Sequence, residues 1–168
     1  MSMGTVMKEK SPFVIGAIAF VLMIGVAISY YLFSYLPEIN KRPTFPAEWI
    51  NPPRTTEIRI VNGAFDPNQK DNYVPKRVTV NIGIDNKVVW INEDITAHTV
   101  TSDTHYHDHY SGAFDSTAEE HWDELPPNGY LMPGSSWSFI FVEPGEYPYH
   151  CIPHPWMQGV IVVKKPTA

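Results

Sequence analysis

The sequence predicts an all-β domain, folded as an antiparallel sandwich or barrel, preceded by one N-terminal transmembrane helix. From Glu57 onward, short segments alternate apolar and polar residues or form short apolar runs. Turn-forming pairs such as Asn-Gly, Asp-Pro, Asp-Asn and Pro-Gly separate these segments. No amphipathic helical pattern of about 10–15 residues follows the N-terminal apolar run. The expected strands include residues 57–60, 77–82, 88–91, 135–142 and 159–163.

The N-terminal helix is predicted from residues 13–36, an uncharged apolar run of 24 residues that follows a short tail, residues 1–12. At about 1.5 Å per residue, such a helix spans roughly 36 Å, enough to cross a hydrocarbon core of about 30 Å. A cleaved signal peptide is the alternative, since residues 27–29 resemble a small-residue cleavage site. The run continues through an aromatic cluster at residues 30–36, which suits a membrane–water interface and favours an uncleaved anchor.

Residues 37–55 contain five prolines and are predicted to form an extended linker between the anchor and the β domain, residues 56–168. Proline fixes φ and removes a hydrogen-bond donor, so a regular helix or a central strand is disfavoured there. The linker could act as a spacer that holds the domain off the membrane. Alternatively, Phe45, Trp49 and Ile50 could pack on the domain as an arm.

Composition argues against nucleic acid as a partner and against sites that need two cysteines. At 168 residues the chain accommodates one ordinary domain plus an attachment. Its formal net charge is −6, and it lacks the clustered Lys and Arg residues that neutralise phosphates, so nucleic acid is not an expected partner. A single cysteine rules out an intrachain disulfide and a binuclear copper site with two bridging cysteines.

That cysteine lies in a motif that predicts a copper site. In the segment Tyr-His-Cys-Ile-Pro-His-Pro-Trp-Met, residues 149–157, Cys151 is followed by His154 and then by Met157. A thiolate, an imidazole and a thioether form a soft ligand set that suits copper, and a mononuclear electron-transfer copper takes two histidines, one cysteine and a weak axial methionine. His98 is the expected second histidine, because it opens a strand-like stretch from which it can project towards the cysteine loop.

These residues, with several other motifs, resemble the cupredoxin family, close to the amicyanin and plastocyanin type. The resemblance covers roughly residues 56–164 and implies a Greek-key β-sandwich with one copper per chain. It also implies single-electron transport, with His154 as the electron exit through an apolar surface patch. One departure is Thr99, where many family members have asparagine. The other matching motifs are Val88-Val-Trp-Ile-Asn92, Phe114-Asp-Ser116, Met132-Pro-Gly134, Phe141-Val-Glu-Pro-Gly-Glu-Tyr147 and Gly159-Val-Ile-Val-Val163.

The resemblance also bears on location and partners. Lys8 and Lys10 precede the apolar run and Lys41 and Arg42 follow it, so the positive-inside rule does not decide the orientation. Members of the family mostly work outside the cytoplasm, which implies a copper domain on the extracytoplasmic side. The implied partners are redox proteins, such as a cytochrome or a membrane oxidoreductase.

An acidic insertion, residues 103–124, carries additional histidines at 105, 107 and 109. On an extended strand, His105, His107 and His109 would share one face and could bind a second metal. The insertion could instead be a copper-acquisition loop, a solvated acidic loop, or a docking face for a basic cytochrome, where complementary charge mainly raises the association rate.

His150, directly before Cys151, suggests an alternative function. Copper nitrite reductases and multicopper oxidases have the same His-Cys pair, and there the histidine binds a catalytic copper. On a strand, however, adjacent side chains point to opposite faces, so His150 should face away from the mononuclear site. The alternatives to an electron carrier are therefore a copper redox enzyme or enzyme subunit, with a second metal at the insertion or at His150, and a copper chaperone with an exposed Cys151.

Overall fold

The computed structural model describes residues 11–41 and 43–166, which belong to two compact units. The first unit is helical: α1 (Pro12–Tyr30) continues through a π-helical segment, η1 (Tyr31–Tyr35), into α2 (Leu36–Ile39). The continuous helix has 28 residues and is long and apolar enough to cross a membrane, a property that N-terminal signal sequences share. Most of the predicted tail, residues 1–10 with Lys8 and Lys10, lies outside the described residues, as does Arg42.

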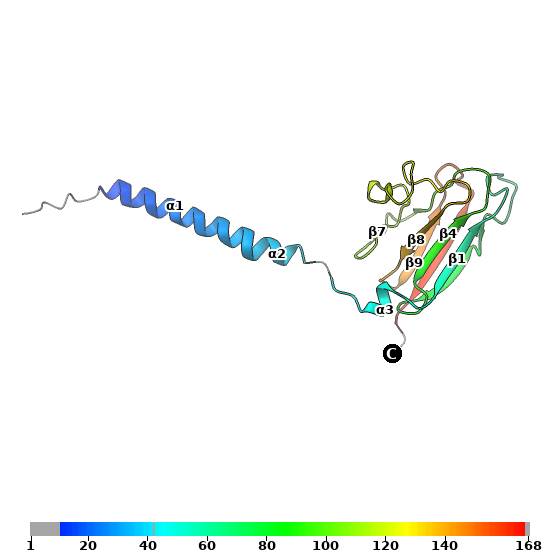
Figure 1. The fold of residues 1–168 in the computed structure, drawn as a ribbon, viewed down its shortest axis with the longest axis horizontal. Helices are drawn as coiled ribbons and strands as arrows, with labels where there is room; N and C mark the ends of the chain where they lie inside the picture. Colours follow the sequence, from blue (N-terminus) through cyan, green and yellow to red (C-terminus); the bar gives the residue numbers. More distant parts are fainter. Residues whose placement is uncertain (1–10, 42, 167–168) are drawn as a thin grey trace, which may run out of the picture. The chain divides into compact units, whose positions relative to one another are not determined.

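The second unit begins at Pro43 and contains two four-stranded sheets, seen as the stacked arrows in Figure 1. One sheet has the strand order β2-β1-β4-β8 and the other β3-β10-β9-β5, while β6 and β7 form a separate two-stranded ribbon. The all-β sandwich predicted from the alternating pattern is therefore confirmed. The strands are β1 (Thr55–Ile60), β2 (Tyr73–Val74), β3 (Arg77–Asn81), β4 (Lys87–Asn92), β5 (Thr101–Ser102), β6 (His107–Asp108), β7 (Gly112–Ala113), β8 (Ser136–Ile140), β9 (Gly145–His150) and β10 (Gln158–Lys164).

The expectation of a wholly antiparallel sandwich was wrong for two strand pairs. β1 pairs with β4 in parallel, and β10 pairs with β3 in parallel, whereas β4–β8, β9–β10 and β5–β9 are antiparallel. Side chains alternate with a period of two in either orientation, so the hydrophobic pattern carries no information about strand direction. The direction depends on the long connections that cross from one sheet to the other.

The core between the sheets is built from the alternating residues of the central strands. Along β4, Val88 and Trp90 are fully buried, and the register places Trp90 opposite Trp137 of β8. The two indole rings stack with their centroids 5.6 Å apart, and Phe114 and Tyr149 pack around Trp90. An aromatic cluster of this size gives the sandwich a rigid centre from which the loops at one end project.

The prediction that the linker, residues 37–55, is extended is wrong for part of its length. It includes α2 and one further helical turn, α3 (Ala47–Ile50). Both turns have a proline near their start: Pro37 is the second residue of α2, and Pro46 directly precedes α3. Proline is tolerated at the start of α3, because the first turn of a helix has no intrahelical acceptor for that N–H. Pro37, by contrast, lies within the continuous helix, two residues after the π-helical segment η1.

Part of the linker packs on the β unit, as the arm interpretation predicted. Trp49 is half-buried against the hydrophobic core, and its carbonyl accepts a 2.8 Å hydrogen bond from the buried Asn86 side chain. Phe45 stacks on Trp49 and meets the ring of Tyr110 edge-on at 6.1 Å. Asn86 stands just before β4, at the end of that strand opposite to the loop that carries His98.

Candidate metal centre

The predicted ligands come from two loops at the same end of the sandwich. His98 lies in the loop after β4, where its backbone forms reciprocal hydrogen bonds of 3.0 and 2.9 Å with Leu131. Cys151 follows β9 directly, and both His154 and Met157 lie in the short loop between β9 and β10. Each loop is therefore anchored at a strand end, which limits how far its side chains can move.

The cysteine loop is closed by its own backbone. The His154 N–H donates to the Cys151 carbonyl at 3.2 Å, and the Met157 N–H donates to the His154 carbonyl at 2.9 Å. The Cys151 N–H in turn donates to the Met157 carbonyl at 3.2 Å, so residue 157 returns to the side of residue 151. Met157 is fully buried, as an axial ligand would be.

Three donor atoms converge between these loops. The Cys151 Sγ lies 3.6 Å from the His98 Nδ1 and 3.5 Å from the His154 Nδ1, and the two Nδ1 atoms are 3.1 Å apart. Ligands that share one ion at about 2.0–2.3 Å have separations of this order. Among the residues that the structure describes, these three form the one group of at least three His, Cys, Asp or Glu side chains with donor atoms gathered closely enough to hold a metal ion. With Met157, they form a candidate site for a single copper ion.

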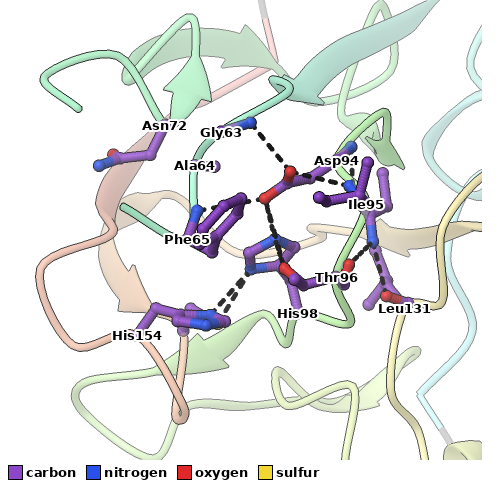
Figure 2. Close-up of polar contacts among 12 residues, drawn as sticks. Gly63, Ala64, Phe65, Asn72, Asp94, Ile95, Thr96, His98, Leu131 and His154 are labelled. Atoms are coloured by element: carbon purple, nitrogen blue, oxygen red, sulfur yellow. Dashed lines mark hydrogen bonds and ion pairs between the residues drawn. The ribbon is translucent and has the colours of Figure 1, made fainter. Parts of the chain in front are cut away.

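Asp94 orients the His98 imidazole, as Figure 2 shows. Its carboxylate lies 2.8 Å from the His98 Nε2, and the Thr96 hydroxyl lies 3.1 Å from the same nitrogen. With Nε2–H donating to the carboxylate, Nδ1 carries the lone pair and faces the cysteine sulfur. Asp94 is not predicted from the sequence, where the one signal available is a carboxylate four residues before the expected ligand.

The protonation preferences of the three donors suit metal binding. Burial lowers the pKa of His98, against the opposing effect of the hydrogen bond that His98 donates to Asp94, and burial also lowers the pKa of His154. Both imidazoles therefore favour the neutral form that coordinates metals. Burial raises the pKa of the Cys151 thiol, against hydrogen bonding that includes the Thr99 N–H, so metal binding at this sulfur releases a proton.

Thr99 connects the two ligand loops. Its backbone N–H donates to the Cys151 Sγ at 3.3 Å, and its hydroxyl oxygen accepts a 2.8 Å hydrogen bond from the Ile152 N–H. Its carbonyl accepts a 2.6 Å hydrogen bond from the Tyr73 hydroxyl. Threonine at this position, where the resemblance leads one to expect asparagine, thus supplies a side-chain acceptor that holds the cysteine loop against the loop of His98.

Replacing Thr99 by valine should lower the free energy of unfolding of the metal-free protein by about 1–3 kcal/mol, because the buried partner of the Ile152 N–H is removed at almost constant volume. Denaturant titration of the intact chain in detergent measures this change. Thr99→Ser retains the hydroxyl and should recover most of the loss. Equal destabilisation by both variants would assign the effect to the lost methyl group instead.

Apolar side chains are exposed on the loops around the site. Ile152 is 48% exposed two residues before His154, and the half-buried Trp156 ring lies 5.4 Å from the His154 ring. Ile95, next to Asp94 in the sequence, is 70% exposed. Met132 is 42% exposed and follows Leu131, whose backbone hydrogen bonds with His98. Of these side chains, Ile152 and Trp156 lie on the same loop as His154, and the apolar patch around His154 stays a prediction.

The prediction of three histidines on one face of an extended strand was wrong. His105 has a φ of +53°, in the left-handed region, and β6 contains only His107 and Asp108. His109 instead approaches Glu143, with 3.5 Å between Nε2 and Oε1. The alternation in the sequence is interrupted by the backbone conformation at His105, so the geometry that motivated a second metal at His105, His107 and His109 is not formed.

His150 lies on the other side of β9 from the candidate copper site. Tyr149 and Cys151, its two neighbours, are fully buried, whereas the His150 side chain is partly exposed. Its Nδ1 hydrogen bonds with Asp103, from the start of the insertion. The structure thus gives His150 a carboxylate partner from the same chain.

A match to a family of copper-binding proteins agrees with this site. Residues 64–164 match the family described as copper binding proteins, plastocyanin/azurin family. The chain is 30% identical to amicyanin from Paracoccus denitrificans over 95 residues. This aligned region covers 56% of this chain and 60% of amicyanin. Among solved structures, the purple cupredoxin from Nitrosopumilus maritimus is 26% identical, with 65% of this chain and 99% of that chain covered and a TM-score of 0.49. A copper-containing nitrite reductase from Thermus scotoductus SA-01 is 21% identical, with 76% of this chain and 28% of that chain covered and a TM-score of 0.48.

The family match spans most of the β unit and includes all four candidate ligands, His98, Cys151, His154 and Met157. The resemblance noted from the motifs is thereby confirmed. The chain belongs to the plastocyanin/azurin family of copper-binding proteins, the cupredoxins.

Proposed function

We propose that this protein is a membrane-anchored, mononuclear blue copper protein that carries single electrons between redox partners. The observation that carries the proposal is the convergence of the His98, Cys151 and His154 donor atoms, all within 4.8 Å of one another. Burial of His98, Cys151 and Met157, each 0% exposed, supports a preorganised site from which water is excluded.

His98 and His154 would hold copper through Nδ1, Cys151 through its sulfur, and Met157 as the weak axial ligand. Copper bound there would supply a one-electron couple. The protein's own contribution is to keep the ligands in place: Pro153 and Pro155 restrict the loop on both sides of His154, and the Leu131 bridge restrains His98. A site that rearranges little favours fast electron transfer.

The partner surface follows from the most accessible of the three ligands. His154 is the half-buried member of the three, whereas His98 and Cys151 are fully buried. With the apolar side chains of Ile152 and Trp156 on the same loop, a redox protein such as a cytochrome or a membrane oxidoreductase would dock over His154. The N-terminal helix would anchor the protein with its copper domain on the extracytoplasmic side.

The competing functions receive less support. A copper chaperone is expected to expose its thiol, but Cys151 is 0% exposed. A second metal at the insertion or at His150 lacks a gathered ligand set in the part of the chain that the structure describes. These observations favour a carrier.

Copper loading tests the proposal. The intact chain, purified in detergent and loaded with Cu(II), should bind one copper and show an intense visible band from charge transfer between the thiolate and copper. Cys151→Ser should abolish the band, while a matched variant with alanine at positions 105, 107 and 109 should retain both the band and the single copper. A folded, copper-loaded wild type without the band would refute the proposal; loss of a second copper in the triple variant would favour the enzyme alternative.

A further inference from the structure

Asp94 is a buried carboxylate with an unusual set of partners. Its side chain is fully buried, and its ion-pairing partner among the described residues is His98, with no Lys or Arg beside it. The carboxylate accepts hydrogen bonds from the backbone N–H groups of Gly63 at 2.9 Å, Phe65 at 3.1 Å and Ile95 at 2.8 Å, in addition to the contact with the His98 Nε2 (Figure 2). These donors outweigh the cost of burial and hold the pKa of Asp94 below its ordinary value.

The position of this carboxylate is fixed by a loop that also touches the cysteine loop. Gly63 and Phe65 donate to Asp94, and the carbonyl of Ala64 between them accepts a 3.2 Å hydrogen bond from the Trp156 indole. Trp156 lies between His154 and Met157 in the sequence. Asp94 is therefore held in a rigid frame that spans both halves of the site, and it cannot turn away from His98 without losing several hydrogen bonds.

Such an arrangement has a chemical consequence for the ligand. A carboxylate that accepts from one ring nitrogen fixes the tautomer and raises the basicity of the other nitrogen. A buried negative charge is also weakly screened, so it interacts more strongly with a nearby ion of higher charge than with one of lower charge. Both effects favour Cu(II) over Cu(I).

We propose that Asp94 is a positioning residue that orients His98 for the metal and lowers the reduction potential of the copper centre. The inference rests on the proposed copper site and goes beyond it, because it assigns control of the potential to a residue that does not bind the metal. Asp94 acts through His98 and through its own fixed charge.

The test compares Asp94→Asn with Glu93→Gln in the intact, copper-loaded chain. Asparagine retains the size of Asp94 and removes its charge, so the preference for Cu(II) over Cu(I) should fall about tenfold, which raises the potential by about 59 mV. Glu93 is the neighbouring carboxylate in the sequence; it is exposed and pairs with Arg59, so Glu93→Gln should leave the potential unchanged. Redox titration of the visible band measures both variants. Equal potentials in Asp94→Asn and wild type, or equal shifts in the two variants, would overturn the proposal.

Proton and nitrogen NMR of the Cu(I) form provides a second readout that needs no variant to fold. In the wild type, the His98 ring should carry its proton on Nε2, with a strongly downfield resonance that exchanges slowly because the donor is buried. A proton on Nδ1 in the metal-free wild type, or a rapidly exchanging Nε2–H in the Cu(I) form, would contradict the role of Asp94. If the wild type shows no thiolate-to-copper band, the proposed function itself fails; with the band present, an unchanged potential defeats only the role of Asp94.

Discussion

Replacing Trp90 by alanine should lower the free energy of unfolding by about 3–5 kcal/mol, the range measured for large aromatic residues removed from protein cores. Trp90 is 0% exposed on the central strand β4. Its ring contacts Trp137, Phe114 and Tyr149, with centroids 5.6–5.7 Å away. Neighbours from both sheets cannot collapse into the vacated space, since each is held by its own strand, so most of the cavity cost should remain.

Denaturant titration of the intact chain in detergent, followed by far-ultraviolet circular dichroism, measures the change. Trp122→Ala is the matched control, because Trp122 is 40% exposed on the insertion and should cost much less. Similar losses for the two tryptophans would show that the aromatic cluster is not the main stabilising element. A second consequence is that Trp90→Ala should weaken copper binding, since β4 leads directly into the loop that carries Asp94 and His98.

Replacing Asp108 by alanine should destabilise the protein by about 3 kcal/mol, because one buried donor left without a partner costs about 1–3 kcal/mol and three part-buried donors lose the same acceptor. Asp108 is 0% exposed, although the sequence places it in an acidic insertion. Its carboxylate accepts hydrogen bonds from the Tyr106 hydroxyl and from the backbone N–H groups of Tyr110, Ser111 and Val142, at 2.7–3.2 Å. It thereby fastens the β6–β7 ribbon to the end of β8.

Two variants separate this role from a general effect of charge. Asp108→Asn keeps one acceptor oxygen and should lose roughly half as much stability as Asp108→Ala. Asp123→Ala removes an exposed carboxylate of the same insertion and should stay within about 0.5 kcal/mol of the wild type. The measurement is the same titration. If Asp108→Ala and Asp123→Ala have the same free energy of unfolding, the Asp108 carboxylate does not hold the insertion on the β unit.

The nature of the copper site could be predicted because most of its ligands are local in the sequence. Cys151, His154 and Met157 lie within seven residues, and a closed loop of that length must bring them together. The positions of β1, β3, β4, β8 and β10 followed from the pattern of apolar residues, which reports burial directly. His98 lies 53 residues before Cys151, so it was identified from the strand-like stretch that it opens and from the additional motifs.

The residues that support the site could not be predicted in the same way. Asp94 acts through the N–H groups of Gly63 and Phe65, which are 31 and 29 residues away in the sequence. Asp108 looks like part of a solvated acidic loop until its contact with Val142, 34 residues away, is known. A carboxylate has no periodic pattern, and its burial depends on which backbone donors the fold brings near.

By itself, then, the sequence determined that this is a β-sandwich with an apolar N-terminal run and one soft-metal ligand set, because side-chain period, length and donor chemistry are local properties. Only the tertiary structure decided which strands run parallel, that residues 45–50 dock as an arm, that His105 interrupts the histidine alternation, and that Asp94 stands behind His98. Those features depend on contacts between segments distant in the chain, where packing and hydrogen bonding outweigh any local preference.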